Sequence, residues 1–289
     1  MEQVAVADDP PVLAHTADDE GAIRVGVLAI RSAVAASAQY GPIVQYLEAE
    51  LGVPVALVPL GQDEQFEAVE ARELDFVFSN PLAAVQLRRI HQIDFLATLS
   101  RKNTGSSFSG VIIARADSGI ETAADVRDRR VACVAIATAA GGCNFQVMHL
   151  RQHGIDVSEF ASFTEVSSQD NIVLSVLSGT EDVGFVRSGQ LEKMLAEETL
   201  LSLDELVIVD QAEDDFYFPH TTRLYPEWPF AALADTDPEL VTSVRDALLA
   251  LDADDPALTP VKGNGFVPAV DYAPLDDLVV ELELRGWDS

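Results

Sequence analysis

The chain has 289 residues, of which 48% are hydrophobic, and a formal net charge of −30 at pH 7. The length allows two packed cores, and the hydrophobic content excludes a chain that is disordered throughout. Such an acidic surface repels nucleic acids and anionic lipids, and no apolar run in the sequence approaches the ~18 residues of a membrane-spanning helix.

Few lysines accompany the many acidic residues. Lys102, Lys193 and Lys262 are the three lysines among 18 basic residues. This composition indicates adaptation to high salt, which is a hypothesis about habitat rather than about function.

Residues 1–21 contain neither the basic stretch nor the apolar core of a signal peptide. We predict a flexible acidic leader, with the folded part beginning at residue 22. An exported domain without its signal or membrane anchor and a cytoplasmic protein would both begin in this way.

Strands and helices alternate from residue 23 onward. Strands are predicted at 23–30, 53–60 and 74–78, and helices at 42–51, from 63 and from 80. Gly52 ends the first of these helices, and Pro81 stands at the first position of the third. Alternation of this kind predicts a mostly parallel α/β sheet.

The same alternation continues in a second unit. Strands are predicted at 95–99, 109–115, 130–137, 181–187 and 206–210, and helices at 122–128, 141–153, 169–178 and 188–198. From Phe216 on, one strand (229–233) and one helix (238–251) remain, too little for a third domain. We therefore predict a first lobe of residues 22–108 with 213–289, and a second lobe of residues 109–212.

Several segments, in their order along the chain, resemble the phosphonate-binding periplasmic (PhnD-like) family. These segments are Gly26–Ile30, Gly41–Leu51, Val58–Leu60, Leu74–Pro81, Ala124–Ala132 and Thr180–Gly184. The stretch His220–Leu233 resembles, more narrowly, the branch that serves as the extracytoplasmic sensor of two-component histidine kinases, including those that detect tetrathionate and thiosulfate. The resemblance covers roughly Ile23 to Trp287.

The resemblance implies an α/β fold of the two-lobed, type II periplasmic-binding-protein kind, with two crossover strands. A small anion would bind between the lobes, and closure of the lobes would be the signal. It also implies an extracytoplasmic location, with membrane anchoring and a kinase core in the full-length sensor. A sensor domain that stops just before a membrane helix would end as this sequence does, at Trp287–Ser289.

The predicted ligand site consists of loops that lead from strands into helices, where backbone N–H groups and the helix dipole favour an anion. In Thr138–Asn144, the small residues Gly141 and Gly142 let a ligand approach the backbone. The resemblance implies a turn rich in Ser and Thr here. Thr138 remains, and alanines replace the other hydroxyls, which argues against phosphonate itself. A tight connection without a ligand is the alternative.

Ser79 and Asn80 precede another helix, where they could contact the ligand or cap the helix. Arg187 directly follows an apolar strand and could bind an oxyanion bidentately, with an ion pair to a nearby carboxylate as the alternative. Because Arg187 lies at the end of a strand and Ser79 and Asn80 lie at the start of a helix, we predict that these side chains face the ligand.

His220, Thr221 and Arg223 place three donors within four residues beside a proline-containing turn, so we predict ligand contacts there as well. Arg223 could instead brace Trp228. Arg31, just after the first strand, is a further ligand candidate, as are Arg101 and Lys102, and all three rank below the loops because isolated surface basic residues are usually solvated.

The two cysteines have different expected environments. Cys133 lies in a predicted strand, where a buried, inert thiol is expected. Cys143 lies at a helix start, which raises thiol reactivity, so it could meet a sulfur oxyanion or pair with Cys133. Pairing stays an alternative, because sequence alone does not show that the two are within reach.

No metal, cofactor or catalytic group is predicted. His149 and His153 share one helix face without an evident third ligand, so we interpret them as solvated helix residues. The sequence contains no nucleophile–base pair and no phosphate-binding loop.

Three functions stay open. The leading one is the anion-sensing domain of a histidine kinase. The second is a free substrate-binding protein that delivers phosphonate, phosphite or a related oxyanion to an ABC permease. The third is an enzyme that shares the fold. The expected partners are a small anion and either a kinase or a permease, and no nucleic acid.

Overall fold

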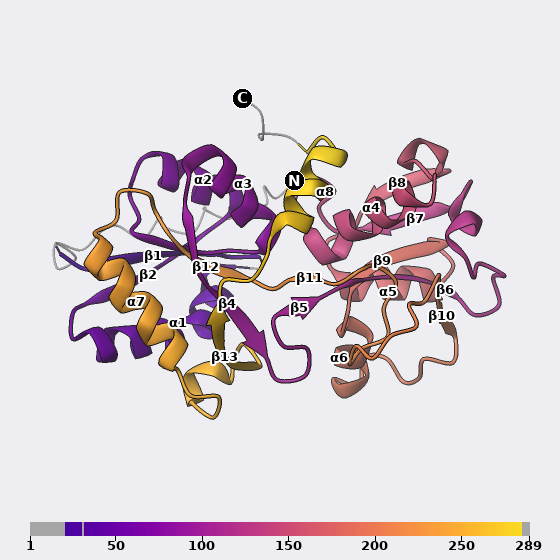
Figure 1. Cartoon of the computed structure of the whole chain (residues 1–289). Coiled ribbons are helices and arrows are strands. Elements are labelled where there is room, and N and C mark those ends of the chain that lie inside the picture. The colour runs from indigo at the N-terminus through magenta and orange to yellow at the C-terminus, as the bar shows by residue number, and fades with distance from the viewer. Residues whose placement is uncertain (1–20, 31, 285–289) are drawn as a thin grey trace, which may run out of the picture.

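The structure is a computed structural model, and it describes residues 21–30 and 32–284. These residues form two α/β lobes, each around its own β-sheet, with a short two-stranded connection between them (Figure 1). The predicted two-lobed α/β fold class is therefore confirmed. The prediction of a mostly parallel sheet is wrong, because five of the nine strand pairings described in the two sheets are antiparallel. Residues 1–20 of the predicted leader and Arg31 lie outside the described residues.

The sheet of the first lobe has six strands in the order β13-β4-β12-β3-β1-β2. They are β1 (Ile23–Leu28), β2 (Val55–Leu60), β3 (Phe76–Phe78), β4 (Asp94–Arg101), β12 (Pro229–Ala232) and β13 (Gly263–Pro268). β1 is parallel to β2 and β3, whereas β12 is antiparallel to β3 and β4. The helices of this lobe are α1 (Ala33–Leu51), α2 (Gln62–Glu70), α3 (Pro81–His91) and α7 (Pro238–Ala250).

The sheet of the second lobe has five strands in the order β10-β6-β9-β7-β8. They are β6 (Gly110–Arg115), β7 (Arg130–Cys133), β8 (Ser162–Glu165), β9 (Val183–Arg187) and β10 (Leu206–Ile208). The helices are α4 (Phe145–Gln152), α5 (Gln169–Leu177) and α6 (Gln190–Ala196), with a π-helical turn at Ala140–Asn144 and 3₁₀ turns at Ala123–Val126 and Val157–Glu159.

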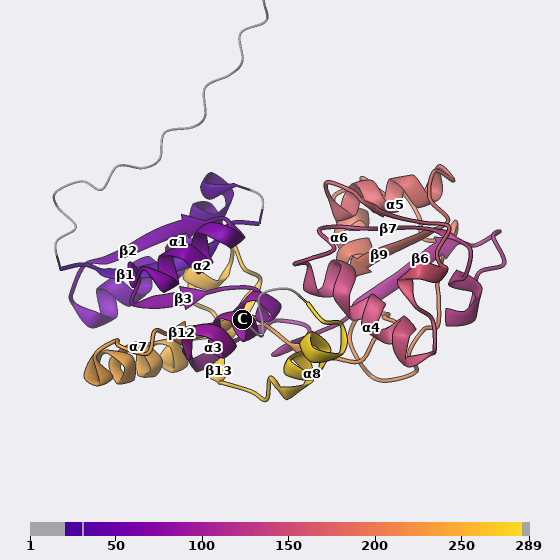
Figure 2. The ribbon, with the colours of Figure 1, turned by 90° about the horizontal axis from the view of Figure 1, so that it is seen from above.

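Two antiparallel crossover strands, β5 (Ser107–Phe108) and β11 (Tyr225–Pro226), lie between the lobes (Figure 1). The view from above in Figure 2 shows the two lobes side by side. Buried hydroxyls fasten the two crossings to each other, because Ser109 Oγ donates to the Thr222 carbonyl at 2.7 Å. The backbone N–H groups of Thr221 and Thr222 also donate to the Gly110 carbonyl. The predicted lobe boundaries stay a proposal, and these bonds favour a return crossing after Thr222 rather than at residue 212.

Helix α8 (Ala273–Glu281) lies between the lobes in Figure 1 and packs against α3 of one lobe and α4 of the other. Its apolar face joins one cluster drawn from both lobes, which includes Leu82, Phe145, Tyr225 and Leu275. The C-terminal segment therefore contacts the second lobe as well as completing the first.

Helix α1 begins nine residues before its predicted start at Pro42. Ser32 caps it, since its Oγ accepts a hydrogen bond from the Ala35 N–H at 3.1 Å. Burial of Ala36 and Tyr40 against the sheet stabilises the extra turns, and Pro42 is accommodated inside the helix. Gly52 ends the helix in the left-handed conformation, with φ of 66°, as predicted.

The prediction of one strand and one helix after Phe216 is wrong, because β13 and α8 also form there. The sequence of β13 does not resemble a strand, because it contains Gly263, Gly265 and Pro268, which have low strand propensity. Pairing with β4 stabilises it in the folded chain. The helices within 21–30 and 32–284 are all too short or too polar to cross a bilayer.

Candidate functional site

Two arginines share one buried carboxylate where the lobes meet. Arg101 Nε lies 2.7 Å from Glu227 Oε1, and Arg187 Nη2 lies 3.2 Å from the same oxygen. The exposed fractions of the side chains are 0% for Glu227, 15% for Arg101 and 35% for Arg187. We call these three residues the interlobe ion cluster; its formal charge is +1, since two guanidinium groups face one carboxylate.

The elements that hold the cluster come from both lobes. Arg101 ends β4 of the first lobe, Arg187 ends β9 of the second, and Glu227 stands between crossover β11 and β12. Arg101 is oriented by a second bond, from Nη1 to the Val261 carbonyl at 2.6 Å. The backbone N–H of Arg187 donates to Gln169 Oε1 at 2.8 Å. The Arg187–Glu227 contact therefore links one lobe to the other.

Aromatic rings border the cluster. The Arg187 guanidinium lies over the Phe108 ring, 5.2 Å from its centroid. Tyr40 stacks on Trp228 with the ring centroids 5.5 Å apart. Apolar surroundings lower the local dielectric, so charge interactions here are stronger than on the open surface.

The charges in the cluster set one another's pKa values. Burial opposes ionisation of Glu227, but Arg101 and Arg187 outweigh it and hold the pKa of this carboxyl below its usual range. Burial raises the pKa of Tyr40 to about 12, although the positive charge of Arg101 acts against it. Glu227 is therefore ionised and Tyr40 is a neutral phenol at neutral pH.

The predicted glycine turn lies beside this cluster. A Cβ atom on Gly141 would be 2.8 Å from Phe108 Cε2 and 3.3 Å from Arg187 Cβ, so the backbone approaches closely and only glycine fits without a shift. Gly142 is similarly confined by Val134 and Gln169. The turn is π-helical and continues into α4, so the amides without intrahelical acceptors are those at the start of the turn itself, which suits an anion there.

Thr138 is partly exposed at the start of this turn. The side chain of Asn144 donates to the carbonyls of Ile136 and Ala139 and so fixes the turn from inside. The structure therefore brings Thr138, Gly141, Gly142 and Arg187 into one region. Their contact with a ligand stays a prediction.

Cys133 and Cys143 form a disulfide, with both residues fully buried beneath the turn. The expectation of an inert free thiol at Cys133 is wrong, because the strand-to-helix turn returns the chain to within disulfide reach. The suggested contact of Cys143 with a ligand is wrong too, since its sulfur is bonded inside the core. The disulfide alternative is the one that the structure contains.

Ser79 and Asn80 have structural partners. Ser79 is buried, and its Oγ donates to Gln65 Oε1 at 2.7 Å. Asn80 caps α3, since its Oδ1 accepts from the Ala83 N–H at 3.0 Å. The capping alternative therefore describes Asn80.

The His220–Arg223 stretch braces the second lobe. His220 is 1% exposed and stacks on Phe216, and burial lowers its pKa despite the nearby Asp214. Thr221 Oγ1 donates to the Val209 carbonyl at 2.8 Å and accepts from the Ile112 N–H at 3.0 Å.

Arg223 is exposed and lies over Tyr225, 5.7 Å from its ring centroid, whereas Trp228 is buried in the core of the first lobe, where it stacks on Tyr40. The structure thus separates the exposed Arg223 from the buried His220 and Thr221 of the same stretch, and none of them belongs to the interlobe ion cluster.

Sequence reasoning ranked Arg101 low and missed Glu227, Tyr40 and Phe108. A signal for Glu227 was present, because it is a carboxylate inside the otherwise apolar stretch Tyr225–Leu233. A buried carboxylate requires a cationic partner.

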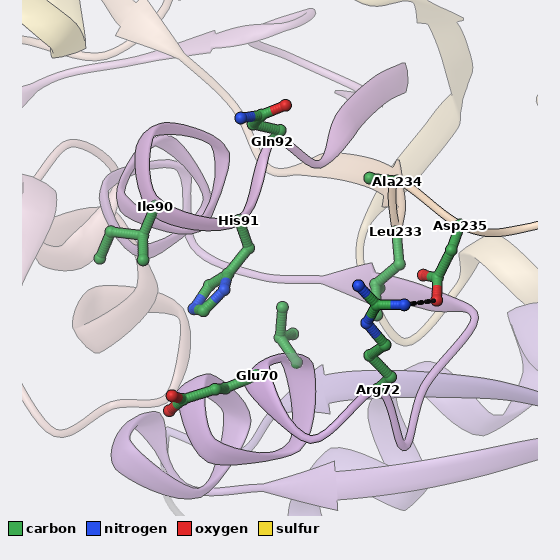
Figure 3. A pocket seen from close by; sticks show the side chains of 9 residues that line it. Glu70, Arg72, Ile90, His91, Gln92, Leu233, Ala234 and Asp235 are labelled. Carbon is green, nitrogen blue, oxygen red and sulfur yellow. Dashed lines mark hydrogen bonds and ion pairs between the residues drawn. The ribbon is translucent and has the colours of Figure 1, made fainter.

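A separate cavity of about 440 Å³ lies on the first lobe, between the ends of α2 and α3 and the segment after β12 (Figure 3). Arg72 Nη1 pairs with Asp235 Oδ2 at 3.1 Å on its rim, and both side chains are largely exposed. The residues of the interlobe ion cluster do not line it, and we assign no ligand to it.

Residues 25–273 match the family model described as "ABC transporter, phosphonate, periplasmic substrate-binding protein". A curated relative, the tetrathionate sensor histidine kinase TtrS of Salmonella typhimurium, is 28% identical over 235 residues. That alignment covers 79% of this chain but only 39% of the kinase, so the chain spans about two fifths of this relative's length.

Among solved structures, PhnD1 from Prochlorococcus marinus in complex with methylphosphonate has a TM-score of 0.71 and 16% identity, over 91% of this chain and 98% of that one. A Xanthomonas citri protein bound to ATP has a TM-score of 0.72 and 18% identity, over 93% and 99%. These similarities show the two-lobed type II periplasmic-binding-protein fold.

Proposed function

The chain belongs to the family of periplasmic substrate-binding proteins of phosphonate ABC transporters, and on that premise we propose that it is an extracytoplasmic receptor that clamps a small anion between its lobes. The family indicates the extracytoplasmic location. The clamp itself is proposed from the interlobe ion cluster.

The observation that supports an anion most directly is the charge of the cluster. Arg101 and Arg187 both contact Glu227, which leaves one positive charge without compensation in a largely buried place. A singly charged oxyanion group would neutralise it, and guanidinium groups bind such groups bidentately. Since the whole chain carries −30, this attraction has to be local.

We infer closure of the two lobes from the fact that the cluster contains residues of both. Arg187 belongs to the second lobe and Arg101 to the first, so an anion that contacts both would hold the lobes together. The short crossover strands β5 and β11 would act as the hinge. Glu227 would keep the two cations paired when no ligand is bound.

For the ligand class, we propose a sulfur oxyanion in preference to a phosphonate. The turn at Thr138–Cys143 offers one side-chain hydroxyl, whereas a dianionic phosphonate requires many donors. A sulfonate group carries a single charge, which matches the +1 of the cluster. The curated relative is named for tetrathionate, which carries one such charge at each end.

For the biological role, we propose a sensor domain, on the strength of the tetrathionate sensor kinase that the chain resembles. The alternative, delivery to an ABC permease, is supported by the family description. An open reading frame that continues into a membrane helix and kinase core favours the sensor, and an adjacent permease gene favours the importer. Turnover of a bound anion would contradict both.

Calorimetric titration with tetrathionate, thiosulfate, sulfate, phosphate and methylphosphonate tests the clamp. We expect one anion to bind with 1:1 stoichiometry. We expect Arg187→Gln and Arg101→Gln each to weaken it about 10- to 100-fold, the usual effect of losing a hydrogen bond to a charged group. Arg115→Gln is the matched control, because Arg115 pairs with Asp117 on the surface of the second lobe.

Small-angle X-ray scattering with the same anion tests closure, and we expect the radius of gyration to fall at saturation. An anion that binds equally well to the Arg187 and Arg101 variants would place the site elsewhere. Binding without a change in the radius of gyration would rule out closure.

A further inference from the structure

Three metal-ligating side chains meet on the second lobe, outside the interlobe ion cluster. His149 and His153 lie one turn apart at the end of α4, and Asp210 follows β10. One ligand atom from each lies within 4.8 Å of the other two. We propose that these residues form a binding site for a divalent transition-metal ion such as Zn²⁺. The interpretation of His149 as a solvated helix residue is wrong, since its side chain is 13% exposed and its Nε2 lies 2.6 Å from Asp210 Oδ2.

The distances are close to those of a metal site. The Nε2 atoms of His149 and His153 lie 2.6 and 3.7 Å from Asp210 Oδ2. In a tetrahedral site with bonds of ~2.0–2.1 Å, ligand atoms lie about 3.3 Å apart. Each of these two contacts therefore needs to change by less than about 1 Å. The third separation, between the ligand nitrogens of the two histidines, is within 4.8 Å.

The hydrogen bond of His153 prepares its ring for this role. Its Nδ1 lies 2.8 Å from the backbone carbonyl of His149. A carbonyl only accepts, so Nδ1 carries the hydrogen and Nε2 keeps the lone pair that a metal requires. The two imidazole rings are tilted by 38° to each other, with their centroids 4.4 Å apart.

The backbone fixes the carboxylate. Asp210 adopts a positive φ of 53°, which aspartate tolerates better than most residues, and its N–H donates to the Glu121 carbonyl at 2.8 Å. The preceding residue, Val209, bonds to the Ile112 carbonyl. These bonds hold Asp210 opposite the end of α4, where the helix dipole also favours a cation.

The donor set selects the class of ion. Two imidazole nitrogens and one carboxylate oxygen suit Zn²⁺, Co²⁺, Ni²⁺ and Cu²⁺, whereas Mg²⁺ and Ca²⁺ prefer oxygen alone. The side chains of His149, Asp210 and His153 are 13%, 33% and 48% exposed, so an ion can enter and keep a water ligand. A bound ion would join α4 to the chain that leads back to the crossover.

Titration of chelator-treated protein with Zn²⁺ and Co²⁺ tests the proposal. We expect one ion per chain, a raised melting temperature, and a visible Co²⁺ absorption band that reports nitrogen ligation. His153→Ala and Asp210→Asn should each weaken binding at least tenfold. His91→Ala, on α3 of the other lobe, is the matched control and should bind like the unaltered chain.

The high acidity of the chain requires a second control, because exposed carboxylates bind divalent ions weakly. Mg²⁺ at the same concentration should give neither the stoichiometric binding nor the rise in melting temperature. Equal Zn²⁺ affinity in the unaltered chain, His153→Ala and Asp210→Asn would overturn the proposal, as would Zn²⁺ binding no tighter than Mg²⁺. His153 is half exposed, so its variant is expected to fold without metal.

Discussion

Glu227 is a fully buried carboxylate whose ionisation depends on two arginines from different lobes. Arg101 and Arg187 contact the same oxygen, and this arrangement satisfies the carboxylate while leaving an excess positive charge. A buried ion pair of this kind adds little net stability, but removing one partner leaves the others unsatisfied. Glu227 therefore determines how much positive charge Arg101 and Arg187 leave for a ligand, and it is their counterion when no ligand is bound.

We expect Glu227→Gln to lower the free energy of unfolding by about 3–5 kcal/mol, since Arg101 and Arg187 would then face each other without a counterion. The bound anion should restore more stability to this variant than to the unaltered chain. Urea unfolding with and without the anion measures both effects. Asp117→Asn, at an exposed ion pair, is the control. Equal stability of Glu227→Gln and the unaltered chain would show that the carboxylate is not needed for folding.

His220 makes stability depend on pH. Burial depresses its folded-state pKa below the ~6.5 of the unfolded chain, so the unfolded state binds the proton more readily. The free energy of unfolding should therefore fall as pH drops from 7.5 to 5.5. His220→Phe keeps the stack on Phe216 and should reduce this slope, whereas Asp214→Asn removes an opposing charge and should steepen it. Identical slopes by urea unfolding in all three chains would contradict this assignment.

At the scale of elements, the turn between β7 and α4 borders the interlobe ion cluster and also contains one half of a disulfide. It presents Gly141 next to Arg187, and its base is closed by the Cys133–Cys143 disulfide, with a sequence separation of 10. A buried disulfide suits an oxidising compartment, in agreement with the location that the family indicates. The bond holds the proposed anion-binding turn in place from below.

Reduction of this disulfide should lower the free energy of unfolding by about 3 kcal/mol, the loop-closure entropy of a ring of this size. Because the turn borders Arg187, the anion affinity should fall as well. Unfolding with and without a reductant, together with titration of the reduced chain, measures these changes. Two free thiols in protein unfolded without reductant would disprove the disulfide.

At the scale of the whole molecule, the charge of −30 opposes both folding and anion binding. The interlobe ion cluster can still bind an anion, because it is shielded from the surface carboxylates by the lobes on either side. Helix α8 contacts both lobes, so it would move relative to at least one of them on closure.

We expect the melting temperature to rise by several degrees between 0.1 and 2 M KCl. Salt screens the repulsion between surface carboxylates, since the Debye length falls from ~10 Å at 0.1 M to ~3 Å at 1 M. Sucrose at matched osmolality does not screen charge and should raise the melting temperature less. Equal stability in low and molar salt would argue against adaptation to high salt.

The sequence by itself determined the two-lobed class and, before Phe216, most of the strands and helices in their order along the chain. These features are recorded locally: apolar periodicity places the elements, Gly52 ends α1, and proline starts α3 and α7. The family resemblance depends on the same ordered segments. Elements with polar or glycine-containing sequences, such as β8 and β13, escaped prediction because sheet pairing rather than local preference stabilises them.

Only the tertiary structure decided which side chains meet. Glu227 lies 126 residues from Arg101 and 40 from Arg187, and Asp210 lies 61 residues from His149. Ion pairs and metal ligation depend on distances of a few ångströms in space, and local patterns do not contain those distances. The sequence indicated only separate basic residues, whereas in the folded chain two of them form the interlobe ion cluster with Glu227. Folding likewise brings Asp210 next to the two histidines.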